Sequence, residues 1–187
     1  MDEAFTNPLP IKVTSYPRSW TATFTVPATP HDKTYEIAFT ALSLTIPDTL
    51  KTSIMPWELS FRQDTGDEMT SRYGVTGGGD AFVIFATVIH ALKVFSRLFT
   101  ARPFIVFTAK EASRQKLYDR FVRLVAAAVP GMHGFKLANT RASREVLGDR
   151  GGGSSYVIVP KHISQKTVVG LIDVWYKKTT TGAREFL

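Results

Sequence analysis

The chain has 187 residues, of which 44% are hydrophobic and 12% aromatic, a composition that supplies a packed core and excludes global disorder. It has no cysteine, which excludes disulfides, thiolate metal sites and cysteine nucleophiles, and its four histidines lie too far apart for a zinc motif. Lys and Arg exceed Asp and Glu by 23 to 16, and the resulting formal charge of +7 favours an anionic partner.

The N-terminal residues carry acids where a secretory signal carries bases. No apolar run reaches the roughly 18 residues that a membrane span needs. We therefore expect a soluble protein made in a cytoplasm, with no membrane partner.

A single domain is expected, with an extended arm over residues 1–18, a core over 19–160 and a C-terminal extension over 161–187. The prolines of the first segment indicate the arm. Three runs of alternating polarity then predict half-buried antiparallel strands. Their expected inward residues are Trp20, Ala22, Phe24 and Val26; Tyr35, Ile37, Phe39 and Ala41; and Trp57, Leu59 and Phe61.

Two helices are predicted next, over about Ala81–Phe99 and Ala112–Val129. Asp80 is expected to cap the first with its carboxylate, and Pro130 and Gly131 to end the second. Between them, the run Phe104–Phe107 is apolar on both faces, as an internal strand is. A strand joined by a helix to an earlier strand forms a parallel pair with it.

Beyond the second helix, strands are predicted near Phe135–Thr140, at Tyr156–Val159 and at Val168–Tyr176. A brief strand is also expected at Arg72–Val75. The order of strands and helices indicates an α/β or α+β fold, a mixed sheet with two main helices packed on it.

A turn with three successive glycines precedes the first helix. The amides of such a turn point outward at the positive end of the helix, so it can bind phosphate. The candidate residues are Thr76, Gly77, Gly78, Gly79, Asp80 and Ala81. The alternative is a purely structural role, in which the glycines only form the turn before the helix and Asp80 only caps the helix. The turn matches neither a dinucleotide fingerprint nor a Gly-Lys-Ser/Thr phosphate loop.

The strand order and these motifs resemble the GNAT (Gcn5-related N-acetyltransferase) superfamily. Thr76-Gly-Gly-Gly-Asp-Ala81 fits the Gly-x-Ala part of the turn with which that family holds the acetyl-CoA pyrophosphate, and Leu117-Tyr118 fits the end of its later helix motif. Thr76, Glu111 and Arg114 depart from the pattern. The resemblance implies a GNAT-like fold, acetyl-CoA as cofactor and Tyr118 as general acid.

Two candidate catalytic side chains have structural alternatives. Glu58, on the third alternating strand, is the best-placed base for an acyltransferase, but its position is also the solvent side of that strand. Tyr118 could equally bury its ring in the core and send its hydroxyl to a backbone carbonyl.

A second resemblance is to small proteins of tailed bacteriophages. It rests on Trp57-Glu-Leu-Ser-Phe61, Thr76-Gly-Gly-Gly-Asp-Ala-Phe82, Ile84-Phe-Ala-Thr-Val88 and the run from Phe107 to Arg120. The resemblance implies a phage gene product, a virion component or infection accessory. It also implies phage or host proteins as partners and a location in the virion or the host cytoplasm.

The leading functional hypothesis is a non-catalytic one, a phage accessory or structural protein that uses a GNAT-like fold as a binding module without a cofactor. The alternative is an acetyl-CoA-dependent N-acyltransferase with Gly77–Ala81, Tyr118 and Glu58 as its site. A third hypothesis is nucleic-acid binding, which requires Lys and Arg on one face, whereas they are spread along the sequence from Lys12 to Arg184.

Overall fold

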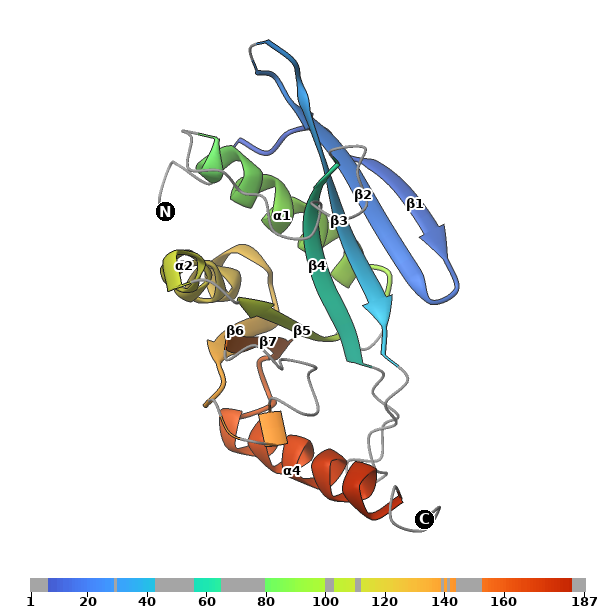
Figure 1. The fold of residues 1–187 in the computed structure, drawn as a ribbon, viewed down its shortest axis with the longest axis vertical. Coiled ribbons are helices and arrows are strands. Elements are labelled where there is room, and N and C mark those ends of the chain that lie inside the picture. The colour runs from blue at the N-terminus through green and yellow to red at the C-terminus, as the bar shows by residue number, and fades with distance from the viewer. Residues whose placement is uncertain are drawn as a thin grey trace. The chain divides into compact units, whose positions relative to one another are not determined.

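The computed structural model describes residues 7–28, 30–42, 56–64, 80–99, 103–109, 112–138, 140, 142–143 and 153–182, without the side chains of 112–114, 175 and 178–182 (Figure 1). The chain divides into two compact units. Unit 1 comprises Met1–Ala41 and Glu58–Thr100, and unit 2 comprises Leu42–Trp57 and Ala101–Leu187. Each unit is treated by itself below.

Seven strands and three helices lie within these described ranges, which confirms the α+β class. In chain order they are β1 (Lys12–Tyr16), β2 (Ser19–Val26), β3 (Lys33–Ala41), β4 (Pro56–Asp64), α1 (Ala81–Ser96), β5 (Phe104–Ala109), α2 (Ala112–Ala128), β6 (Met132–Lys136), β7 (Ser154–Pro160) and α4 (Gln165–Gly182). None of the helices in the described part of the chain is both long and apolar enough to cross a bilayer.

Unit 1 holds a sheet in the order β1–β2–β3–β4, with β1 and β3 antiparallel to β2. The predicted inward residues of β2 and β3 are all buried, because a period of two places every second side chain on the same face. On β4, Trp57 and Leu59 are buried and Phe61 is half-buried. The alternation in the sequence therefore predicted this face correctly.

Helix α1 covers that inner face, and aromatic rings hold the two layers together. Phe95 of α1 stacks on Phe39 at 4.0 Å between ring centroids and lies 5.6 Å from Trp20. Farther along the sheet, Tyr35 stacks between Phe24 and Phe61, with centroid distances of 5.4 Å to each. The outer face carries mainly threonine, serine and charged residues that are half-buried or exposed.

The predicted N-terminal arm contains a strand that the sequence analysis missed. Pro10 and Pro17 leave six residues between them, and the last five of these, Lys12–Tyr16, pair with β2 as β1. Ahead of β1, the Leu9 amide donates to Thr87 Oγ1 at 2.9 Å, and Thr87 Oγ1 donates to the Val83 carbonyl at 2.8 Å. Part of the arm is therefore fixed to the buried Thr87 of α1.

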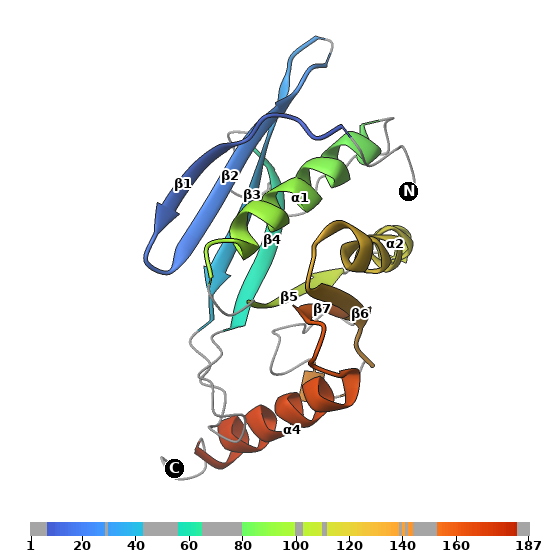
Figure 2. The same ribbon diagram turned by 180° about the vertical axis from the view of Figure 1, so that it is seen from behind.

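Unit 2 holds a three-stranded antiparallel sheet with β7 between β5 and β6. Phe107 and Tyr156 face α2, where the ring of Phe121 packs against Phe107 at 5.7 Å. The alternate residues Phe104, Val106, Val157 and Val159 form a cluster with Val168, Leu171 and Ile172 of α4. The two helices thus lie on opposite faces of the strands (Figures 1 and 2), which confirms that Phe104–Phe107 is an internal strand.

The strand predicted at Val168–Tyr176 is wrong, because this segment lies within helix α4. Val168, Leu171 and Ile172 recur at helical spacing and are buried together. The helix begins after Ser164, whose hydroxyl oxygen accepts from the Thr167 amide at 3.1 Å as an N-cap. A short apolar run of this kind fits the period of a strand as well as that of a helix.

Helix α2 ends before Pro130 and Gly131, as predicted, and Gly131 takes a φ of 81°, which favours glycine. Strand β6 then starts at Met132, three residues before the predicted Phe135. Gly134 lies so close to α2 that a Cβ atom there would be 3.0 Å from the Cβ of Val122. Of the remaining predictions, the strand at Arg72–Val75 lies outside the described residues, and the parallel pair of β5 with a strand of unit 1 stays a prediction.

Candidate functional site

The predicted phosphate turn is only partly described. Thr76, Gly77, Gly78 and Gly79 lie outside the described residues, whereas Asp80 and Ala81 begin α1. The prediction that the Asp80 carboxylate caps the helix is wrong, since its side chain makes no capping hydrogen bond. Its φ of −73° and ψ of −14° are helical, while a side-chain cap needs an extended backbone. Its carbonyl instead accepts from the Ile84 amide at 3.0 Å.

The negative charge of Asp80 affects the pKa of a buried tyrosine of the same unit. Tyr35 of β3 is 1% exposed. Burial, and in second place the negative charge of Asp80, raise the pKa of Tyr35 above its ordinary value. The phenol is therefore neutral at physiological pH and adds no charge beside the start of α1.

Tyr118 is half-buried on α2, and its ring packs among aromatic residues. It meets Phe107 edge-on at 5.5 Å and Tyr156 edge-on at 5.9 Å between centroids. This is the environment that the packing interpretation expects. The role of Tyr118 as a general acid stays a prediction.

Glu58 is exposed on β4, on the outer face of the unit 1 sheet. It belongs to unit 1 and Tyr118 to unit 2, so neither unit by itself joins the two candidate catalytic residues. The acetyl-CoA site and the GNAT-like fold likewise stay predictions. In the described part of the chain, no three His, Asp or Glu side chains gather in the way that a metal ion requires.

Unit 2 contains a polar cluster that sequence reasoning missed, formed by Tyr156, Asp119 and Lys136. The Tyr156 hydroxyl donates to Asp119 Oδ1 at 2.8 Å and lies 3.1 Å from the Gln115 carbonyl. Lys136 Nζ lies 3.9 Å from the same Asp119 oxygen and 5.9 Å from the centre of the Tyr156 ring. Three elements, β7, α2 and β6, supply these side chains.

The electrostatics of this cluster keep Tyr156 protonated. Burial, followed by the hydrogen bond and negative charge of Asp119, raises the pKa of the Tyr156 phenol far above its ordinary value. A phenol in this state donates a hydrogen bond, here to the Asp119 carboxylate. The cluster therefore holds the Asp119 carboxylate toward the sheet.

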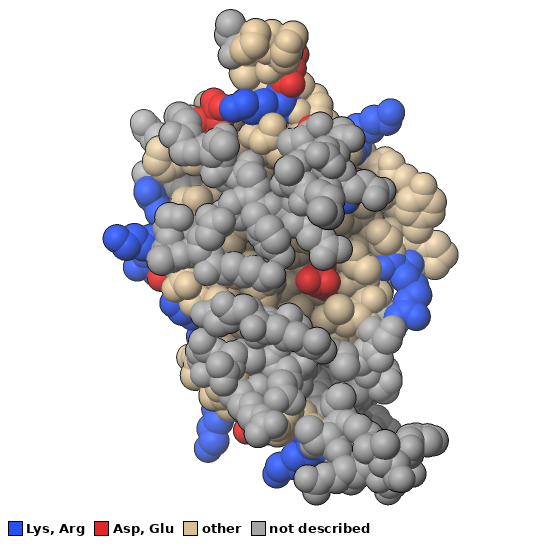
Figure 3. All heavy atoms as spheres, in the orientation of Figure 1, with Lys and Arg blue, Asp and Glu red and all other residues tan. Residues whose placement is uncertain are grey.

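The outer side of α2 carries cations at helical spacing. Lys116, Arg120 and Arg123 stand at i, i+4 and i+7, which places them along one stripe of the helix. Lys116 and Arg123 are exposed, and Arg120 is half-buried. Asp119 is the one acid within the helix, and its carboxylate contacts Tyr156 and Lys136. Figure 3 shows Lys and Arg side chains projecting at the margin where Figure 1 draws α2.

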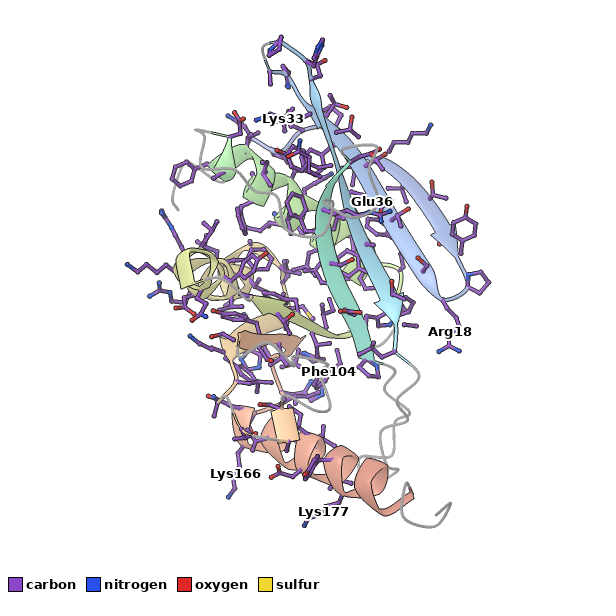
Figure 4. All side chains as sticks on the ribbon, viewed as in Figure 1. Arg18, Lys33, Glu36, Phe104, Lys166 and Lys177 are labelled. Carbon is purple, nitrogen blue, oxygen red and sulfur yellow. The ribbon has the colours of Figure 1, made fainter. Side chains whose placement is uncertain are left out.

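The other helix of unit 2 also presents cations to solvent. Lys166 and Lys177 of α4 are exposed, and Figure 4 shows both extending from the side of the helix away from the strands. Lys161, in the turn after β7, is exposed as well. Both outer layers of unit 2 are therefore basic.

The two units differ strongly in charge. Unit 1 has seven Lys and Arg against nine Asp and Glu, a formal charge of −2, whereas unit 2 has sixteen against seven, a formal charge of +9. The two values account for the +7 of the whole chain. A count made separately for the two halves of the sequence would have revealed this asymmetry, which is itself a signal of nucleic-acid interaction.

Comparisons of the chain with known family models, with curated proteins and with solved structures find no match. The site is therefore interpreted from its own geometry and charge.

Proposed function

We propose that this protein is a non-catalytic binding module that holds nucleic acid on the basic surface of unit 2. The observation that carries the proposal is the division of charge, +9 in unit 2 against −2 in unit 1. A polyanion binds most tightly where positive charge is concentrated on one unit, because each phosphate that is neutralised there releases counterions.

The stripe on α2 supports a phosphate backbone as the ligand. With a rise of 1.5 Å per residue, Lys116, Arg120 and Arg123 follow one another at about 6 Å and about 4.5 Å along the helix axis. Such a row of cations can meet successive phosphates of one strand. The carboxylate of Asp119 lies beside that row, and its negative charge is partly offset by Lys136 and by the hydrogen bond from Tyr156.

The resemblance of residues 57–120 to tailed-phage proteins supports a phage protein as the setting in which nucleic acid is bound. A virion component or an infection accessory works in the presence of the phage genome. We therefore place the binding function in a phage accessory or virion-associated protein.

Binding to a labelled DNA duplex, measured by fluorescence anisotropy at several salt concentrations, tests the proposal. The logarithm of the affinity should fall linearly with the logarithm of the salt concentration. The double variant Lys116→Gln/Arg123→Gln should lower the steepness of that line by up to about 1.8, since each lost phosphate contact accounts for about 0.9.

The matched control is Arg18→Gln/Lys33→Gln, which removes the same charge from unit 1 (Figure 4). It should bind nearly as the parent does. No binding at about 50 mM salt, where such contacts are strong, would overturn the proposal. So would a control that loses as much affinity as the α2 variant.

A further inference from the structure

Strand β1 is an edge strand with one partner. It stands at the end of the strand order, beside β2 only, so half of its backbone amides and carbonyls point away from any described strand. All five of its residues are exposed. None of the described strands or helices covers this edge, which lies at the border of the sheet in both ribbon views (Figures 1 and 2).

The edge also exposes apolar side chains. Val13 is 42% and Tyr16 is 64% exposed. The register pairs Val13 with Ala22, which is buried in the core, and Tyr16 with Ser19 on the outer face. Helix α1 therefore covers β2 but does not shield β1. A further strand paired with β1 would place side chains beside Val13 on the inner face and beside Tyr16 on the outer face.

We infer that β1 pairs antiparallel with β1 of a second copy of this chain, about a two-fold axis at Thr14. In this register Lys12 lies opposite Tyr16 of the copy, Val13 opposite Ser15, and Thr14 opposite Thr14. No like charges are opposed, and Lys12 meets an aromatic ring. The strand is thus complementary to itself.

The low charge of unit 1 is compatible with a second copy as the occupant. Pairing through β1 opposes two units of formal charge −2, which repel far less than two units of +9 would. Pro10 and Pro17 limit the pairing to at most the six residues between them, since proline cannot donate to a strand ladder. An isologous pairing of this kind uses up β1 in both copies and closes as a dimer.

The chain has no cysteine, so single cysteine variants report the pairing without background. Directly opposed residues in antiparallel strands have Cα atoms about 4.5–5.5 Å apart, within disulfide range. Thr14→Cys should therefore form a disulfide-linked dimer under mild oxidation. Thr40→Cys, exposed on β3, is the control and should stay largely monomeric.

The register has its own test. Lys12→Cys and Tyr16→Cys should each fail to link to themselves, because the two copies of either residue lie about 14 Å apart at 3.4 Å per residue. A mixture of these two variants should form the mixed disulfide. Equal linking of Thr14→Cys and Thr40→Cys would overturn the inference, as would a mixture that does not link.

A charge exchange at Tyr16 tests the pairing in the cysteine-free protein. Tyr16→Lys opposes lysine to Lys12 at two places in the dimer, whereas Tyr16→Glu opposes opposite charges there. In sedimentation equilibrium the parent should dimerise, Tyr16→Lys should raise the dissociation constant on the order of tenfold, and Tyr16→Glu should not. A monomeric parent at about 100 μM, an upper limit for a small but specific interface, would overturn the inference.

Discussion

In unit 1 strands β2 and β3 alternate between buried residues and more open ones, whereas every residue of β7 in unit 2 is buried. The difference follows from the number of covered faces. One helix covers one face of the unit 1 sheet, while α2 and α4 cover both faces in unit 2 (Figure 1). The polar residues of unit 1 therefore lie on the open face of its strands. Those of unit 2 lie mainly on the outer sides of its helices, where Lys and Arg form a basic exterior.

The largest effect is expected for a ring in the α4 side of the unit 2 core. Phe104 is 0% exposed, and Phe104→Ala should lower the free energy of unfolding by about 3–5 kcal/mol. The control Thr40→Ala, exposed on the outer face of the unit 1 sheet, should change it by less than about 0.5 kcal/mol. Urea unfolding measures both. Similar losses for the two variants would contradict the comparison.

A polar exchange tests the number of covered faces directly. Val157→Thr places a hydroxyl in an apolar cluster and should cost about 1–3 kcal/mol. The reverse exchange Thr21→Val, on the outer face of the unit 1 sheet between Thr14 and Ala38, should stay within about 0.5 kcal/mol. If Val157→Thr left the free energy of unfolding unchanged, this face of β7 would not be fully covered.

The two buried phenols should differ in what their hydroxyls contribute. Tyr156→Phe removes the hydrogen bond to Asp119 and should cost about 1 kcal/mol, because the Asp119 side chain is 40% exposed and water can replace the donor. The Tyr35 hydroxyl has no hydrogen-bond partner among the described residues, so Tyr35→Phe should be nearly neutral. Thermal unfolding at pH 7 separates the two variants, and a larger loss at Tyr35 would be unexpected.

The same phenols predict how stability depends on alkaline pH. Both pKa values are raised in the folded protein above the ordinary tyrosine pKa of about 10. Their contribution is therefore complete below pH 10 and is lost as the pH rises toward the folded pKa values, because the unfolded chain releases the protons first. The free energy of unfolding should fall as the pH rises above about 10, and less steeply in Tyr156→Phe. An equal slope in both proteins would contradict the raised pKa of Tyr156.

The smallest effect is expected on the outer face of unit 1. Arg62 and Glu36 form an ion pair at 2.7 Å, with side chains 50% and 23% exposed. Solvent screens such a pair, so a double-mutant cycle with Arg62→Gln and Glu36→Gln should give a coupling of about 0.2–1 kcal/mol. The coupling should shrink at high salt, and a constant value would argue against an electrostatic origin.

The sequence predicted the elements wherever a local period was long enough to read. The alternation from Trp20 to Val26 and the apolar helix after Asp80 were both located correctly. The run Val168–Tyr176 was misread because a short apolar stretch fits a strand and a helix equally well without the cap at Ser164. Strand β1 was missed because its exposed residues carry no hydrophobic period.

The candidate site was predictable only in part. Tyr118 was singled out correctly as a residue of the second helix, yet its neighbour Asp119 makes the clearest polar contact of the cluster. Asp119 and Tyr156 are 37 positions apart, and nothing local in the sequence links them. The glycines of the predicted turn lie outside the described residues, so that part of the hypothesis stays a prediction.

The sequence by itself determined which residues enter the core and the total charge, because hydrophobic periods and charges are properties of neighbouring positions. The charge asymmetry between the two halves is also present in the sequence, and the tertiary structure added only the bounds of the units that carry −2 and +9. The tertiary structure alone decided that Tyr156 holds Asp119 and that β1 ends a sheet. These features depend on contacts between distant segments, and chain folding rather than chain order creates such contacts.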